Sequence, residues 1–104
     1  MKRIINGQRY DTDKAKLVAE RETDLPRSDF RWAREELYRT PRGRWFVAGR
    51  GHGMTRWARV HDDGMRGMGE GIVAMTPEEA REWLEAEEDT AAVERYFGDA
   101  VEDA

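Results

Sequence analysis

The chain has 104 residues, of which 38% are hydrophobic and 38% charged, and its formal net charge is −4. This length allows one domain with a single small core, and it excludes a catalytic domain joined to a second module. The absence of cysteine excludes a disulfide framework, a thiolate nucleophile and a thiolate metal site. Four Trp, three Tyr and three Phe residues provide enough large apolar surface to order so charged a chain.

The charges are distributed unevenly along the chain. Residues 1–60 contain 15 basic and 8 acidic residues, a balance of +7, whereas residues 61–104 contain 3 and 14, a balance of −11. So large an asymmetry suggests a partner that recognises charge. The sequence has no apolar run of the roughly 18 residues that a membrane-spanning helix needs. The opening MKRIINGQ lacks the apolar segment of a signal peptide, so we expect a cytoplasmic protein.

The first part of the chain predicts a hairpin followed by a short helix. Residues 2–10 alternate around the pair Asn6-Gly7, which is typical of a type I′ hairpin turn. The next segment, 11–22, begins with residues suited to a helix N-cap. It is predicted to form a short helix whose apolar face consists of Ala15, Leu17 and Val18.

The middle of the chain predicts the central hairpin of a small sheet. Residues 35–50, EELYRTPRGRWFVAGR, are predicted to form two strands joined by a tight turn at Pro41-Arg42-Gly43. Residues 55–60, TRWARV, alternate well enough to predict a third strand with Trp57 pointing inward. Residues 61–71 contain four glycines and predict a loop. A short apolar strand is predicted over residues 71–75.

The last part of the chain predicts two helices. Thr76-Pro77-Glu78-Glu79 has the pattern of a capping box with proline at the first helical position. The helix is predicted to continue to about Glu88, and its buried stripe consists of Ala80, Trp83 and Leu84. A second helix is predicted from Thr90 to Phe97, ending at Gly98.

The sequence therefore predicts one α+β domain over residues 1–98, followed by an acidic C-terminal tail at 99–104. Its small antiparallel sheet consists of the hairpins 2–10 and 35–50 and the strand 55–60. A short N-terminal helix and two C-terminal helices complete the predicted fold.

Acidic side chains are predicted to line the exposed face of the first C-terminal helix: Glu78, Glu82, Glu85 and Asp89. At this spacing the carboxylates follow one another at roughly 4.5–6 Å, not far from the charge spacing along one strand of a duplex. Like-charge pairs four residues apart cost about 0.2–0.5 kcal/mol each, and a merely solvated face usually includes lysines. Two interpretations stay open: a solvated outer face, and a negative surface that competes with nucleic acid for a basic protein groove.

A second candidate surface is rich in arginine and contains Arg42, Arg44, Arg50, Arg56 and Arg59. Arginines interleaved with aromatic residues on a sheet suit single-stranded nucleic acid or RNA. Strand alternation, however, places neighbouring residues on opposite faces. The aromatic rings are then equally well explained as core and the arginines as solvent-exposed.

No metal, cofactor or catalytic residue is predicted, and we expect the protein not to be an enzyme. His52, His61, Asp62 and Asp63 match no metal-ligand spacing. The glycine-rich segment 64–71 lacks the spacing and the lysine of a phosphate-binding loop. Ser28 is the single serine, and no nucleophile and base are paired by their spacing.

Several segments carry a family resemblance: RIINGQRYDT at 3–12, ELYR at 36–39, GRWF at 43–46, TPEEAREW at 76–83 and YFG at 96–98. In their order and spacing they resemble a family of short proteins carried on phages and integrative elements. The matching residues are structural: a hairpin turn, a strand pair, a capping box and a helix end. Residues 51–71 depart most from the family pattern.

The resemblance implies a non-enzymatic inhibitor from a mobile element, similar to anti-CRISPR proteins and acting in the cytoplasm of the bacterial host. Its expected partner is a CRISPR effector complex, whose basic DNA-binding groove would be blocked by an acidic, DNA-mimicking surface. The alternative is a small arginine-rich protein that binds nucleic acid or has a regulatory role. The sequence leaves open the type of effector, the oligomeric state and which of the two charged faces is the functional one.

Overall fold

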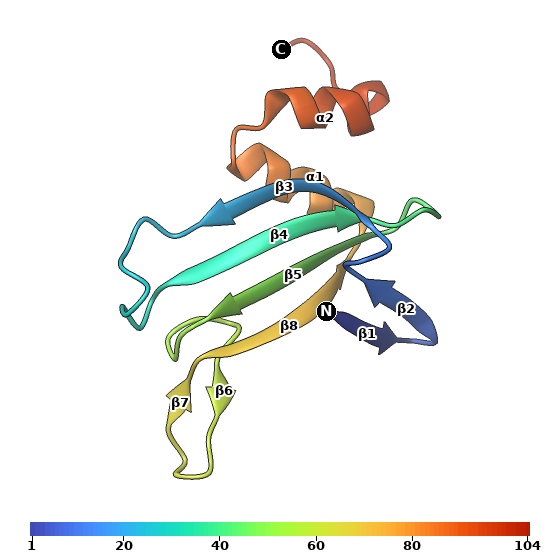
Figure 1. Ribbon diagram of the computed structural model, residues 1–104. Helices are drawn as coiled ribbons and strands as arrows, with labels where there is room; N and C mark the ends of the chain where they lie inside the picture. Colours follow the sequence, from blue (N-terminus) through green and yellow to red (C-terminus); the bar gives the residue numbers. More distant parts are fainter.

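A four-stranded antiparallel sheet forms the centre of the protein (Figure 1). The computed structural model describes every residue, 1–104. In order across the sheet, the strands are β3 (Lys16–Glu22), β4 (Ala33–Arg39), β5 (Trp45–Gly51) and β8 (Gly69–Met75). The predicted hairpin over residues 35–50 is confirmed as β4 and β5, which occupy the two inner positions of the sheet.

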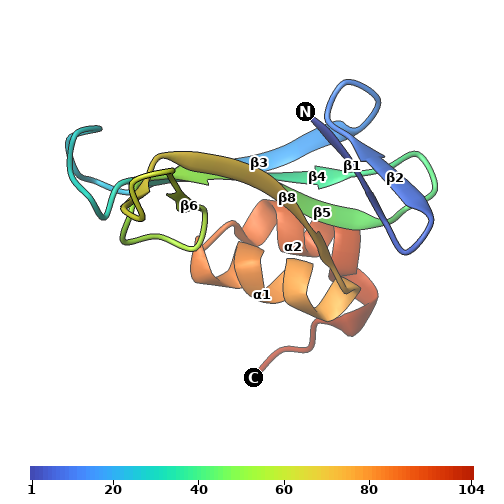
Figure 2. The same ribbon diagram turned by 90° about the horizontal axis from the view of Figure 1, so that it is seen from below.

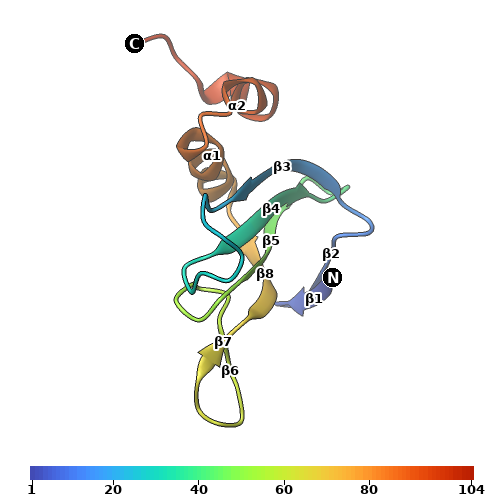
Figure 3. The ribbon, with the colours of Figure 1, turned by 60° about the vertical axis from the view of Figure 1, so that its left-hand side comes forward.

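The N-terminal hairpin is confirmed, but it forms a separate two-stranded sheet. It consists of β1 (Lys2–Ile5) and β2 (Gln8–Asp11). Asn6 and Gly7 between them have φ values of 50° and 78°, as a type I′ turn requires. The hairpin lies on the side of the central sheet away from the helices (Figures 2 and 3). Tyr10 packs there against Phe46, with a distance of 5.5 Å between ring centroids.

Both C-terminal helices cover the other face of the sheet (Figure 2). Helix α1 (Pro77–Ala86) begins at the predicted capping box: Thr76 accepts a hydrogen bond from the Glu79 backbone, and Glu79 accepts one from the Thr76 backbone. Helix α2 (Thr90–Phe97) follows, and the short 3-10 helix η1 (Gly98–Ala100) continues directly from it. The core on this face contains Leu37, Trp45, Val47, Trp57, Ala80, Trp83, Leu84 and Val93.

The predicted N-terminal helix is wrong, because residues 16–22 form the edge strand β3. The register between β3 and β4 shifts between Leu17 and Ala19, which makes Val18 an extra residue in the strand. Val18 and Ala19 both pack against the core on the helix side, while Leu17 is exposed. Two successive apolar residues on one face break the alternation of a strand, and the sequence then resembles a helical pattern.

The predicted third strand at 55–60 is also wrong. Only Arg59–Val60 is extended; it forms β6 and pairs with β7 (Arg66–Gly67) in a small hairpin, which projects beyond the sheet (Figures 1 and 3). The strand beside β5 is β8, which begins at Gly69, inside the predicted loop. Trp57 does point inward as predicted, but from a loop. Its ring passes over Gly49, where a Cβ atom would overlap it, so glycine makes room for the ring.

The end of the chain differs in detail from the prediction. Helix α1 ends at Ala86, two residues before the predicted end, and Glu88 takes a φ of 55° in the turn to α2. Gly98 has a φ of −54° and starts η1, so it is not a left-handed helix cap. Residues 101–104 are exposed and have no regular structure. Neither helix has the length and apolar character needed to cross a bilayer.

Candidate functional site

The outer side of the helical layer is acidic. Helix α1 turns Ala80, Trp83 and Leu84 toward the sheet, and it exposes Glu78, Glu82 and Glu85 to solvent. Among these three carboxylates, only Glu85 has an ion pair, with 3.6 Å between its Oε1 and Arg81 Nε. Residues 76–104 contain 11 acidic and 2 basic residues, a balance of −9. Of the carboxylates in this segment, only Glu85 and Glu87 have an ion pair, so most of the negative charge is uncompensated.

Asp89 belongs to the start of α2 and not to the row on α1. Its carboxylate accepts a hydrogen bond of 3.1 Å from the Ala92 backbone and caps the helix. Asp89 nevertheless lies close to Glu85, because both line a shallow depression of about 510 Å³. Two further carboxylates line it, those of Glu88 and Glu94. We define the acidic face as three exposed residues of α1, one exposed residue of α2 and the α2 cap: Glu78, Glu82, Glu85, Glu94 and Asp89.

The capping role of Asp89 gives a prediction about stability. Asp89→Ala is expected to lower the free energy of unfolding by about 1 kcal/mol, because the Ala92 N–H loses its acceptor. Asp89→Asn keeps a capping oxygen and is expected to change stability by only a few tenths of a kcal/mol. Urea denaturation of both variants checks this. Equal losses for the two substitutions would contradict the capping role.

The five predicted arginines do not form one surface. Arg42 and Arg44 lie in the turn between β4 and β5, whereas Arg50 lies near the opposite end of β5. A seven-residue strand spans roughly 20 Å, so these positions are far apart. Arg56 forms an ion pair with Glu35, with 3.0 Å between Nε and Oε2, and Arg59 lies in β6. The structure brings Arg50 and Arg59 together, since both line one depression of about 570 Å³.

Glu35 is a buried carboxylate that sequence reasoning does not single out. Its two oxygens accept hydrogen bonds from the Trp57 and Trp83 indole nitrogens at 2.9 and 3.1 Å. Arg21 donates to it from Nη2 at 2.8 Å and from Nε at 3.1 Å, and Arg56 donates from Nε at 3.0 Å. These donors come from β3, α1 and the loop before β6. Glu35, in β4, therefore joins four segments of the fold. Both of its carboxylate oxygens are occupied by hydrogen bonds that hold these segments together.

The surroundings of Glu35 make stability depend on pH. Burial acts to raise its pKa, but the Trp83 hydrogen bond, the Arg56 charge, the Trp57 hydrogen bond and the Arg21 charge together lower it below the ordinary 4.5. With a lower pKa in the folded state, the stabilisation is complete above the unfolded-state pKa and is lost as the pH falls through the folded-state pKa.

We therefore expect Glu35→Gln to be much less stable than the wild type near neutral pH, with the difference shrinking below about pH 4.5. Denaturant titrations of both proteins at about pH 7 and about pH 3 check the sign. A difference that is constant or grows toward low pH would contradict it.

The two histidines of the chain lie in different surroundings. His52 packs edge-on against the rings of Phe30 and Trp32. The His61 ring lies against Gly67 in the β6–β7 hairpin. The structure has no group of three or more His, Asp or Glu side chains arranged to hold a metal ion.

Comparisons with protein-family models, with curated protein sequences and with solved structures found no match. Function must therefore be argued from the side chains and charges of the chain itself.

Proposed function

We propose that the protein is a non-enzymatic inhibitor that blocks DNA binding by a bacterial CRISPR effector complex. The acidic face would occupy the basic groove that otherwise receives DNA. The partner is taken from the resemblance described above. The single observation that carries the proposal is a rigid helical surface on which Glu78, Glu82 and Glu94 are exposed and have no ion pair.

The backbone positions that carry the carboxylates of α1 are fixed. The helix is capped at its start by Thr76, and Trp83 and Leu84 anchor it to the sheet with almost no exposed surface. From Glu78 to Glu85 the helix rises about 10 Å, so the charges advance by roughly 4.5–6 Å per step. A rigid helix avoids the cost of ordering a flexible backbone segment on binding, which favours affinity for a groove built for phosphates.

The acidic side chains of α1 also reduce the stability of the helix itself. Glu78 and Glu82 are like charges four residues apart on one helix, which is destabilising by about 0.2–0.5 kcal/mol. No basic residue lies in the last turn of α1, where a cation would be favourable. A negative surface of this kind steers association with a basic partner, and the association rate then falls with increasing salt.

The proposal is tested with purified CRISPR effector complexes and the 104-residue protein. We expect stoichiometric capture of the protein by an effector without DNA, weaker capture at high salt, and no capture by an effector loaded with target DNA. Capture that is equal with and without target DNA would overturn the DNA-mimic mechanism. Failure to bind any effector type would overturn the assignment of the partner.

A further inference from the structure

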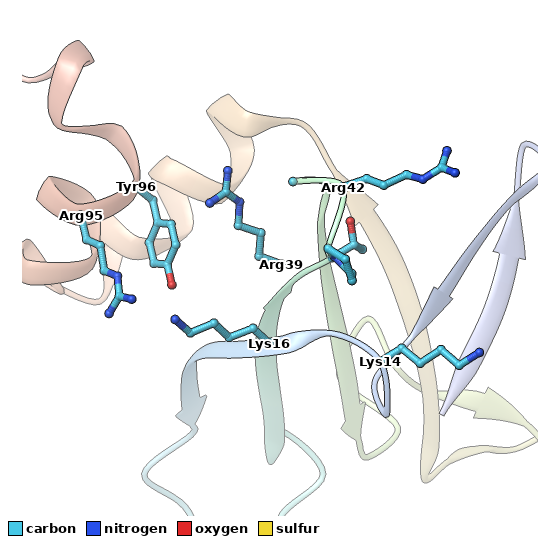
Figure 4. Close-up of a pocket in the computed structure, with 9 residues that line it drawn as sticks. Lys14, Lys16, Arg39, Arg42, Arg95 and Tyr96 are labelled. Carbon is cyan, nitrogen blue, oxygen red and sulfur yellow. The ribbon is translucent and has the colours of Figure 1, made fainter.

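A basic groove lies at one end of the central sheet, between the β4–β5 turn and α2 (Figure 4). It has a volume of about 670 Å³, and only one of its nine lining residues is hydrophobic. Five cationic side chains line it, contributed by the segment before β3, by β3, by the end of β4, by the β4–β5 turn and by α2: Lys14, Lys16, Arg39, Arg42 and Arg95. We call this surface the basic groove.

Three of these cations gather around one aromatic ring. Arg39, Arg95 and Lys16 lie 5.3, 5.5 and 5.9 Å from the centroid of the Tyr96 ring. Figure 4 shows their end groups converging on Tyr96, while Lys14 and Arg42 extend toward the β1–β2 hairpin. Arg39 also lies 5.4 Å from the Trp45 ring, and its buried Nε has no hydrogen-bond partner. The aromatic rings thus hold the Arg39 guanidinium in place near two other cations.

None of the five cations has an ion pair, although carboxylates outnumber basic residues in the chain by 22 to 18. Outside the groove, five of the thirteen other basic residues form ion pairs with carboxylates: Arg21, Arg31, Arg34, Arg56 and Arg81. A shortage of acidic residues therefore does not explain the uncompensated groove. An external anion would supply the missing partner.

The positive surface continues past the groove. A second depression of about 560 Å³ shares Lys14 and Arg42 with it and adds Arg9 and Arg44. Asp11 is the one carboxylate among the residues lining either depression. The two depressions together form an open track, which suits an extended anion better than a single phosphate held in a closed cradle.

We propose that the basic groove binds the phosphodiester backbone of a single nucleic-acid strand. Arginine and lysine side chains bind phosphate oxygens, and a guanidinium plane held against aromatic rings, as that of Arg39 is, provides a surface on which a base stacks. Nucleic-acid interfaces are polar and strongly positively charged, as this groove is. The groove and the acidic face share no residue, so this inference does not rest on the proposed function.

Fluorescence anisotropy with labelled oligonucleotides of about 15 nucleotides, one of DNA and one of RNA, tests the inference. The variant is Lys16→Glu with Arg42→Glu, which changes two exposed residues of the groove. The matched control is Arg50→Glu with Arg59→Glu, an equal charge change at exposed positions near the other end of the sheet. Inorganic phosphate serves as a competitor, and sedimentation velocity reports self-association.

We expect the wild type to bind at least one oligonucleotide, with an affinity that falls as salt increases. The groove variant should lose at least about tenfold in affinity, and its log–log salt slope should fall by about 0.7 for each lost phosphate contact. The control should stay close to the wild type. The relative affinity for the two oligonucleotides shows whether the groove prefers RNA or DNA. The inference would be overturned if the wild type bound neither oligonucleotide, or if the groove variant and the control lost equal affinity. It would also be overturned if the groove served only self-association, seen as a salt-sensitive dimer that the groove variant abolishes and as no binding of either oligonucleotide.

Discussion

Replacing Glu35 by alanine is expected to lower the free energy of unfolding by about 3–5 kcal/mol, which is the cost of breaking a buried charge network. The indole N–H groups of Trp57 and Trp83 would lose their acceptor inside the core, at about 1–3 kcal/mol each. The two guanidinium partners are less costly to release. The side chains of Arg21 and Arg56 are 33% and 47% exposed, so water can solvate them in part.

Denaturant unfolding of Glu35→Ala beside Glu20→Ala measures this effect. Glu20 also lies on the central sheet and pairs with Arg34 at 2.7 Å, but its side chain is 53% exposed, so its replacement should cost less than about 1 kcal/mol. Glu35→Gln keeps one carbonyl acceptor. Its loss in free energy of unfolding should therefore lie between those of the two alanine variants, at about 1–3 kcal/mol. If Glu35→Ala cost no more than Glu20→Ala, the buried carboxylate would not hold these segments together.

Reversing three charges of the acidic face is expected to abolish inhibition of a CRISPR effector while leaving the fold intact. The variant is Glu78→Lys, Glu82→Lys and Glu85→Lys, and the expected loss of affinity for the effector is at least about 100-fold. Asp89 is left unchanged because it caps α2. Stability should change by no more than about 1 kcal/mol, because these side chains are exposed and only the weak Arg81–Glu85 pair is lost.

The control for the charge reversal is a variant with the same change in net charge at other exposed carboxylates: Asp13→Lys, Asp24→Lys and Asp62→Lys. Inhibition by this control should stay within about threefold of the wild type, since long-range electrostatics alone mainly alters association rates. Circular dichroism and urea unfolding verify that both variants are folded. An active charge-reversal variant, or equal losses in both, would refute a role for the acidic face.

Features with a strong local signal could be predicted from the sequence. Asn6-Gly7, the β4–β5 hairpin and the Thr76 capping box each depend on residues close together in the chain, and each is present in the structure. The errors arise where tertiary structure decides. The bulge at Val18 mimics a helical pattern, and Trp57 enters the core from a loop because Gly49 leaves room for its ring.

The candidate sites were predictable only in part, for the same reason. Glu78, Glu82 and Glu85 lie on the exposed side of α1 because helical periodicity fixes their face. The basic groove could not be predicted, since it joins Lys16, Arg39 and Arg95 from β3, β4 and α2. The predicted helix over residues 11–22 would have removed Lys16 from the sheet, where it pairs in register with Arg39.

The most direct test of the central claim is a competition titration of a CRISPR effector with labelled target DNA at several fixed concentrations of the protein. If the acidic face occupies the DNA-binding groove, the apparent Kd for DNA should rise linearly with the concentration of the protein from its value without the protein. Saturating DNA should then displace the protein completely. A ternary complex of effector, DNA and protein, with the Kd for DNA unchanged, would contradict the account.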